Sequence, residues 1–207
     1  MSNILKVVNL ECHRSDEVIF KDLNFKIDRG DNLEIIGSNG SGKTTVLRLL
    51  LGLIPSFSGE IHWSTSQDSS KSEENYTSCF YQGHQIGIKP LLTTYENLKF
   101  SISGFNSSDD EIALVAKRVG IEGFLNRRSS DLSAGQKKRI AIGRWLLKDF
   151  NLYLLDEPFT ALDDKGVKLI EDIIAEMNSR GSSFLITGHR PSRLNSHKIY
   201  LDQKNEL

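Results

Sequence analysis

The chain has 207 residues and a formal net charge of −1, with 26% charged and 38% hydrophobic residues. This balance argues against a basic nucleic-acid-binding surface and indicates one water-soluble domain, or a domain with one subdomain. No apolar run approaches the roughly 20 residues of a membrane-spanning helix, and Lys6 interrupts the apolar start, unlike a signal peptide. The two cysteines, Cys12 and Cys79, lack metal-type spacing and are expected to be reduced thiols.

The first part of the chain predicts strands. Ile4–Leu10 and Val18–Phe20 are short apolar segments, and Leu23–Ile27 alternates apolar and polar residues as a half-buried antiparallel strand does. Residues 28–31 carry a glycine-containing turn signal. The apolar segment 32–36 then predicts a strand that leads into a glycine-rich loop.

That loop, residues 37–45, matches the P-loop pattern G-x-x-x-x-G-K-[ST]. Its glycines let backbone N–H groups point at phosphate oxygens, and the N-terminus of the following helix adds partial positive charge. Lys43 suits the β- and γ-phosphates of ATP, and the Thr44 hydroxyl suits Mg²⁺. The predicted nucleotide-binding residues here are Gly37, Ser38, Asn39, Gly40, Ser41, Gly42, Lys43, Thr44 and Thr45.

After a helix predicted to end at Gly52, Gly59–Trp63 resumes a strand. Residues 64–75 are serine-rich and lack apolar periodicity, so they predict an exposed loop at the tip of a hairpin. Residues 76–81 are the expected returning strand.

Helical patterns then interrupt the strands. Thr93 or Thr94 is expected to cap one helix, residues 109–126 to form one or two more, and Ser133 to open a longer one. We therefore expect a single domain, 1–207, with a catalytic core from 1–88 and 151–207 and a helical subdomain over about 89–150.

The last part of the chain returns to an α/β rhythm. The apolar run 151–155 is typical of a strand buried on both faces of a parallel sheet. A helix is predicted over 164–179, a strand over 183–187 and an edge strand over 198–201. The fold class is therefore α/β, of the P-loop NTPase type, with a mixed sheet, an antiparallel β-subdomain and an inserted helical subdomain.

Asp156 and Glu157 end the buried run in a Walker B pattern. Asp156, at the carboxyl end of the strand, can hold Mg²⁺, and Glu157 can accept a proton from the attacking water. An ordinary acidic strand end is the alternative, but it does not explain the neighbouring motifs.

Residues 132–136 read Leu-Ser-Ala-Gly-Gln and resemble the LSGGQ signature of ABC-type ATPases, with Ala134 in place of the first glycine. Ser133 and Gly135, at a helix N-terminus, form a second anion site. With Gln136, they are expected to contact a nucleotide held by the P-loop of another copy. The resemblance implies an ABC-type ATPase core and a head-to-tail homodimer in the ATP-bound state.

Other elements of this family follow in order. Thr160–Asp163 resembles the D-loop, and His189 resembles the switch histidine that contacts the γ-phosphate. Gln85 is predicted as the Q-loop glutamine, which senses Mg²⁺ and links to a membrane partner, with Gln82 as a close rival. The predicted catalytic residues are Glu157, His189 and Gln85, and the predicted metal-binding residues are Thr44, Gln85 and Asp156.

The aromatic residue that stacks on adenine in this family is absent near its expected place, where His13 and Arg14 stand. Either side chain could stack on the base, and Arg14 is the predicted contact. Stacking contributes about 1–3 kcal/mol per base, whereas several hydrogen bonds to phosphate contribute about 1.5–3 kcal/mol each. We therefore expect weaker discrimination for adenine and retained nucleotide binding.

The run from Tyr81 to Lys89, with Gly-His-Gln-Ile-Gly-Ile-Lys, is similar to the Q-loop of the CcmA family, the haem exporter ATPases of cytochrome c biogenesis. Residues 92–98 and 156–163 also suit this family. Gln82 does not, because the family is expected to have leucine at that position. The resemblance implies a peripheral subunit on the cytoplasmic face of a bacterial inner membrane. That subunit would bind the membrane proteins CcmB, CcmC and CcmD, and ATP hydrolysis would release the haem-loaded chaperone CcmE.

Two alternatives stay open. One is an ATPase that energises a different ABC transporter, and the other is a soluble ABC protein acting on DNA or ribosomes. Proteins of the second kind usually have tandem domains or basic surfaces, which this near-neutral chain lacks. No Cys-x-x-Cys-His motif is present and the five histidines are scattered, so direct binding of haem is not expected. The near-neutral charge likewise predicts no binding of nucleic acid.

Overall fold

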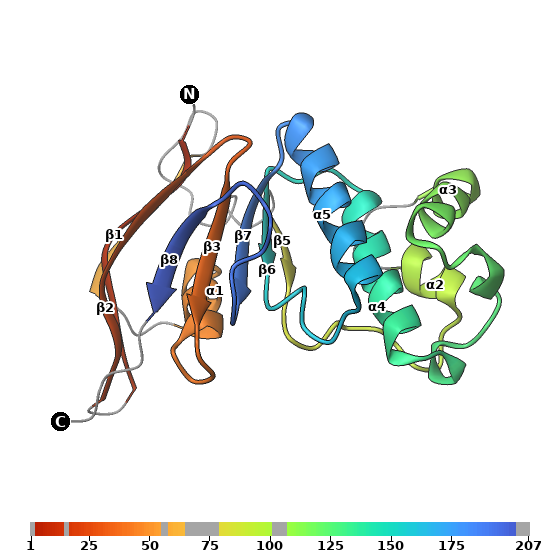
Figure 1. Ribbon diagram of the computed structural model, residues 1–207, viewed down its shortest axis with the longest axis horizontal. Helices are drawn as coiled ribbons and strands as arrows, with labels where there is room; N and C mark the ends of the chain where they lie inside the picture. The colour runs from red at the N-terminus through yellow and green to blue at the C-terminus, as the bar shows by residue number, and fades with distance from the viewer. Residues whose placement is uncertain (1–2, 15–16, 55–57, 65–78, 101–106, 202–207) are drawn as a thin grey trace. The chain divides into compact units, whose positions relative to one another are not determined.

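The computed structural model describes residues 3–14, 17–54, 58–64, 79–100 and 107–201 (Figure 1). The chain divides into two compact units. The first comprises residues 1–84, 150–161 and 171–207, and the second comprises residues 85–149 and 162–170.

The first unit contains an antiparallel sheet of three strands in the order β2-β1-β4. These strands are β1 (Asn3–Arg14), β2 (Glu17–Asp28) and β4 (Ser58–Trp63). The two segments predicted separately at 18–20 and 23–27 form one strand. A bulge with Asp22 in the left-handed region (φ 54°) lies between them and shifts the register without ending the strand.

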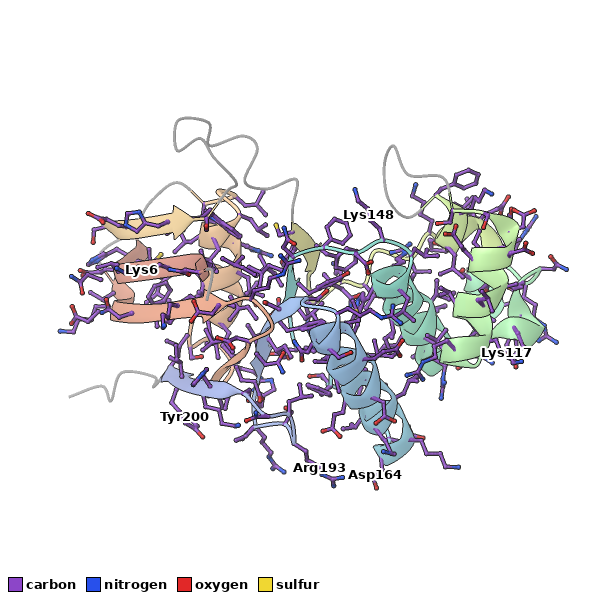
Figure 2. The ribbon with its side chains drawn as sticks, turned by 90° about the horizontal axis from the view of Figure 1, so that it is seen from above. Lys6, Lys117, Lys148, Asp164, Arg193 and Tyr200 are labelled. Carbon is purple, nitrogen blue, oxygen red and sulfur yellow. The ribbon has the colours of Figure 1, made fainter. Side chains whose placement is uncertain are left out.

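The first unit also contains a parallel sheet of five strands in the order β5-β6-β7-β3-β8. Its members are β3 (Asn32–Gly37), β5 (Cys79–Gln82), β6 (Leu152–Leu155), β7 (Ser183–Gly188) and β8 (His197–Leu201). All four residues of β6 are buried, as its uninterrupted apolar run predicted. The predicted edge strand is also confirmed: β8 lies at the sheet edge, and Tyr200 on it is 59% exposed (Figure 2).

The predicted hairpin around residues 64–75 is wrong. β4 pairs with β1 in the antiparallel sheet, whereas β5 pairs with β6 in the parallel sheet. A serine-rich stretch indicates only that a segment cannot build a core, and it carries no information on which strands pair on either side of it. Residues 65–78 themselves lie outside the described part of the chain.

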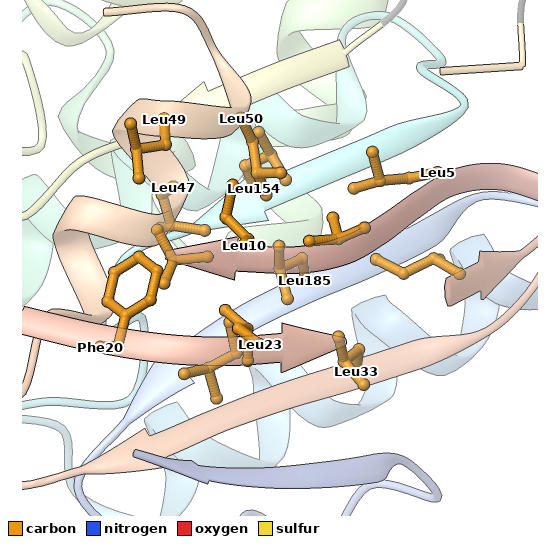
Figure 3. Packing of buried hydrophobic residues seen from close by; sticks show 14 of the residues in the cluster. Leu5, Leu10, Phe20, Leu23, Leu33, Leu47, Leu49, Leu50, Leu154 and Leu185 are labelled. Atoms are coloured by element: carbon orange, nitrogen blue, oxygen red, sulfur yellow. The ribbon is translucent and has the colours of Figure 1, made fainter. Parts of the chain in front are cut away.

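One hydrophobic cluster joins the two sheets and helix α1 (Lys43–Leu50) (Figure 3). Leu10 and Leu23 come from the antiparallel sheet, Leu154 and Leu185 from the parallel sheet, and Leu47 from α1. Each buried leucine stabilises the fold by about 1.5–3 kcal/mol relative to an exposed one. The cluster therefore fixes the strand and the helix that flank the P-loop.

The predicted turn at 28–31 is confirmed by the bond from Asp31 N to Asp28 O, 3.1 Å, and by the left-handed backbone of Gly30 (φ 87°). Ser183 Oγ accepts a hydrogen bond from Gly30 N at 2.8 Å. Asn178 Nδ2 donates to Gly30 O at 3.2 Å near the end of α5 (Asp164–Ser179). These bonds hold the start of β3 beside β7.

The second unit contains α2 (Thr94–Lys99), α3 (Asp109–Val119) and α4 (Ala134–Gly143). Each begins with a capping box, in which the first side chain accepts from a backbone N–H three residues later and a Glu or Gln there bonds back. The pairs are Thr93 with Glu96, Ser108 with Glu111, and Ser133 with Gln136. Of the two caps considered for α2, the structure therefore selects Thr93.

A polar cluster in the second unit ties residues 86–93 to the helices. Asn97 Nδ2 donates to Lys89 O and Thr93 O, both at 3.0 Å. Arg144, which directly follows α4, donates from Nη1 to the carbonyls of Ile86 and Gly87, both at 3.1 Å. Burial lowers the pKa of the Arg144 guanidinium. The segment that follows Gln85 is thus bonded to Arg144 at the C-terminal end of α4, the helix that Ser133 caps at its N-terminus.

Candidate nucleotide-binding and catalytic site

The P-loop connects β3 to α1 in the first unit. A Cβ atom on Gly37 would lie 2.3 Å from Ser41 Oγ, and one on Gly42 (φ 96°) would lie 2.6 Å from Ile19 Cγ2. Both positions therefore require glycine. Gly42 directly precedes α1, and the first turn of that helix contains no acidic residue, so no side chain of the helix itself offsets the positive end of its dipole at the loop.

Lys43 and Ser41 present polar groups inside this loop. Lys43 is 4% exposed, and its Nζ donates to Gly37 O at 2.8 Å and to Ser38 O at 2.9 Å. Ser41 Oγ is buried and has no hydrogen-bond partner among the described residues. Because buried hydroxyls are normally paired, this atom fits a loop built to receive phosphate oxygens.

Asp156 directly follows β6 and accepts hydrogen bonds on both carboxylate oxygens. Thr44 Oγ1 donates to Oδ2 at 2.9 Å, and Thr187 Oγ1 donates to Oδ1 at 2.7 Å. The carboxylate is 3% exposed. A threonine hydroxyl and a carboxylate beside a phosphate-binding loop are the hard oxygen donors that Mg²⁺ prefers, so these residues fit the metal that the fold implies.

The Glu157 carboxylate is surrounded by positive or polar groups. Its Oε1 lies 3.2 Å from His189 Nε2 and 3.5 Å from Lys43 Nζ. Its Oε2 lies 4.0 Å from His84 Nδ1 and accepts a hydrogen bond from Thr160 Oγ1 at 3.4 Å. The structure therefore brings together the predicted Glu157, His189 and Lys43 around one carboxylate.

Two residues of this site escaped the sequence analysis. Thr187 was part of a predicted strand and had no assigned role. His84 was part of the Gly-His-Gln run and was not predicted to lie at the site. The available signal for Thr187 is its place at the carboxyl end of a buried parallel strand, where functional side chains gather. His84 is 73% exposed and lies near Glu157.

The signature residues lie in the second unit. Ser133 Oγ accepts from Gln136 N at 3.2 Å, and Gln136 Oε1 accepts from Ser133 N at 2.9 Å, so these two predicted nucleotide contacts cap α4. Gly135 is exposed, and a Cβ atom on it would meet only Ser133 Oγ, at 4.0 Å.

The remaining predicted residues are less closely tied to the site. Gln82 ends β5, is 7% exposed, and its carbonyl accepts from Asp156 N at 2.8 Å. Gln85 is exposed and belongs to the second unit. The choice between these glutamines stays a prediction. Arg14 ends β1 and its side chain lies outside the described part, while the neighbouring His13 lies 2.7 Å from Glu11.

Residues 20–160 match the family model of ABC transporters. The chain belongs to this family, and it is the nucleotide-binding ATPase subunit of the class, whose members dimerise and work with membrane subunits. Within the residues that the structure describes, no helix is long and apolar enough to cross a membrane.

The cytochrome c biogenesis ATP-binding export protein CcmA of Mannheimia succiniciproducens is 42% identical over 91% of this chain and 88% of its own. The CcmA of Haemophilus influenzae is 40% identical over 90% and 89%. The chain belongs to this CcmA group. An ABC transporter ATP-binding protein from Pyrococcus furiosus has the same fold, with a TM-score of 0.83, 21% identity, and coverage of 97% of this chain and 98% of its own.

Proposed function

We propose that the chain hydrolyses ATP in a site shared by two copies. The P-loop of one copy holds the phosphates, and the signature residues Ser133, Gly135 and Gln136 of the other close over them. The convergence of Lys43 and His189 on the Glu157 carboxylate, within 3.5 Å, carries the hydrolytic part of this proposal.

Within this site, Glu157 accepts the proton of the attacking water at its carboxylate. Lys43 exchanges its bonds to the carbonyls of Gly37 and Ser38 for bonds to the β- and γ-phosphates. His189, whose Nε2 lies 3.2 Å from Glu157 Oε1, would donate a hydrogen bond to the γ-phosphate, so that it and Lys43 together stabilise the charge that develops there. Mg²⁺ held by Thr44 and Asp156, with Gln85 as a third contact, would supply further neutralisation of phosphate charge.

Gly135 supports the shared site. Glycine is a poor helix former, and among the described residues only Ser133 Oγ, at 4.0 Å, lies near the place of a Cβ atom on Gly135. Close approach of a group from a second copy would account for a glycine at this position. By contrast, Gly37 and Gly42 are required by contacts within the chain.

We further propose that this ATPase serves cytochrome c biogenesis as an export protein, as the names of its CcmA relatives say of them, with haem as the cargo that the Q-loop resemblance implies. It would bind CcmB, CcmC and CcmD at the cytoplasmic face of the inner membrane, and its cycle would release haem-loaded CcmE. We place the helical subdomain at about 89–150. The segment 86–93 is bonded to Asn97 and Arg144, so a movement of the Q-loop would be passed through these bonds to the helices of that subdomain.

A pull-down from solubilised membranes, with and without ATP, tests this role. Recovery of these Ccm proteins supports it, whereas consistent recovery of a different transporter contradicts it and favours the alternative ABC transporter. Recovery of nucleic acid or ribosomes would favour a soluble ABC protein. Stoichiometric haem binding by the isolated chain would overturn the expectation that haem does not bind this subunit.

A measurement of GTP binding tests the proposed adenine contact. With Arg14 or His13 in place of an aromatic ring, phosphate contacts dominate, and we expect GTP and ATP affinities to agree within roughly tenfold, or about 1.4 kcal/mol. Competition of each nucleotide against a fluorescent ATP analogue measures both constants. A far lower affinity for GTP than for ATP would show that the chain reads the base by another contact.

A further inference from the structure

Thr187 contacts both acidic residues of the site through one hydroxyl. Its Oγ1 donates to Asp156 Oδ1 at 2.7 Å and accepts from the backbone N–H of Glu157 at 3.0 Å. The side chain is fully buried. A hydroxyl can donate one hydrogen bond while accepting another, so both contacts form at the same time.

The register of the parallel sheet creates this position. Leu155 on β6 is paired with Ile186 on β7, so the next residues along each strand, Asp156 and Thr187, are also neighbours. Leu154 and Leu185, two residues earlier, both face the cluster that contains α1. Because side chains alternate along a strand, Asp156 and Thr187 point to the same side of the sheet as those leucines. Thr44, in the first turn of α1, contacts Asp156 on that side.

Two threonines from different elements thus fix the Asp156 carboxylate, one on each oxygen. Thr44 occupies Oδ2 and Thr187 occupies Oδ1. With both oxygens held, the carboxylate plane cannot rotate without breaking a hydrogen bond. The orientation of the proposed metal contact is therefore set before any ligand arrives.

The same hydroxyl also fixes the backbone of Glu157, which is left-handed with φ 53°. A non-glycine residue rarely adopts this conformation unless its surroundings hold it. The bond from Glu157 N to Thr187 is a contact that holds it. Rotation of this backbone would move the carboxylate away from Lys43 and His189.

We infer that Thr187 is a positioning residue that sets the metal contact Asp156 and the general base Glu157 together through its hydroxyl. This inference rests on the proposed roles of Asp156 and Glu157 in ATP hydrolysis. It adds a physical link between them, because a single atom on the strand that leads to His189 determines the geometry of both.

The test compares Thr187→Val, which keeps the shape and removes the hydroxyl, with Thr187→Ser, which keeps the hydroxyl. Thr94→Val is the matched control: Thr94 is also fully buried, and its hydroxyl has no hydrogen-bond partner among the described residues. Circular dichroism and thermal unfolding check that each variant is folded, and Thr187→Ala replaces the valine variant if that one does not fold.

The first readout does not require hydrolysis. In a Glu157→Gln background, binding of Mn²⁺ together with ATP is followed by electron paramagnetic resonance. We expect Thr187→Val to raise the Mn²⁺ concentration for half-saturation roughly tenfold or more, as loss of a group that orients a metal ligand does. Thr187→Ser and Thr94→Val are expected to match the parent.

The second readout is steady-state ATP hydrolysis in the otherwise native chain. Thr187→Val is expected to lower kcat roughly 10- to 100-fold with little change in KM, and Thr187→Ser to restore it. Unchanged Mn²⁺ binding and kcat in Thr187→Val, or equal losses in the valine and serine variants, would overturn the inference. A native chain that binds ATP with Mn²⁺ but never hydrolyses it would refute the proposed function instead, and the metal readout would still decide on Thr187.

Discussion

Replacement of Glu157 by glutamine is expected to lower ATP hydrolysis at least roughly 100-fold, because a general base contributes about 10²–10⁴ to the rate. Glutamine keeps the size and the hydrogen-bonding oxygen but cannot accept the proton. ATP affinity should stay within about threefold of the native value, since the phosphate contacts of the P-loop are untouched. Phosphate release measures the first quantity, and titration with a fluorescent ATP analogue measures the second.

Glu60→Gln is the matched control for this prediction. Glu60 is also paired with a histidine, His62, at 2.8 Å, but it lies in the antiparallel sheet and is exposed. Its substitution should leave hydrolysis and binding unchanged. Near-native turnover in Glu157→Gln would remove Glu157 from the role of base and leave the general base unassigned.

Lys43→Ala is expected to weaken ATP binding by about 10- to 150-fold. This range corresponds to the net loss of one charge-assisted hydrogen bond to phosphate, about 1.5–3 kcal/mol, because about 1.4 kcal/mol corresponds to a tenfold change in affinity. Arginine is a poor substitute, because Lys43 is 4% exposed and a planar fork does not fit a site built for a compact charge. Titration with the same ATP analogue measures the loss.

Lys26→Ala is the control for Lys43→Ala, because it also removes one lysine ammonium from the first unit. Lys26 is exposed and bonds Asp28 at 3.0 Å on β2, so its loss should not change ATP affinity. If both lysine variants bound ATP as the native chain does, the P-loop would not be the phosphate site.

Much of this site could be predicted because its residues act over short distances along the chain. In the P-loop, the nearest neighbour of Gly37 is Ser41, four positions later, although Gly42 is crowded by the distant Ile19. The cap at Ser133 depends on Gln136, three residues later. The buried strand ahead of Asp156 depends on four consecutive apolar residues. Such features follow from local residue types alone.

Features that depend on distant pairing could not be predicted. A threonine in a strand is ordinary, and only the register between β6 and β7 places Thr187 next to Asp156. Glu34 lies within a strand predicted from its apolar residues, and it is only 3% exposed. Its carboxylate can be buried because it accepts hydrogen bonds from Ser192 N at 2.8 Å and from Ser192 Oγ at 3.0 Å. Its partner lies 158 positions away. A pattern read along the chain does not contain such contacts.

The separation of β4 and β5 into different sheets has the same origin. Both flank a serine-rich stretch, and adjacent strands in sequence usually pair. Here β4 completes a sheet with β1, while β5 extends the parallel sheet beside β6. The functional consequence is that Gln82, at the end of β5, lies against Asp156.

The shared site is tested most directly by the molar mass of Glu157→Gln in solution, measured by light scattering with and without Mg²⁺ and ATP. In this background, Ser133→Arg places a bulky cation on the signature. Ser108→Arg is the control, because Ser108 caps α3 through a capping box of the same kind. The account predicts that ATP doubles the mass from 23.3 kDa, that Ser108→Arg does the same, and that Ser133→Arg stays at one copy. An ATP-bound chain that remains at the mass of one copy, or a dimer that Ser133→Arg leaves intact, would contradict it.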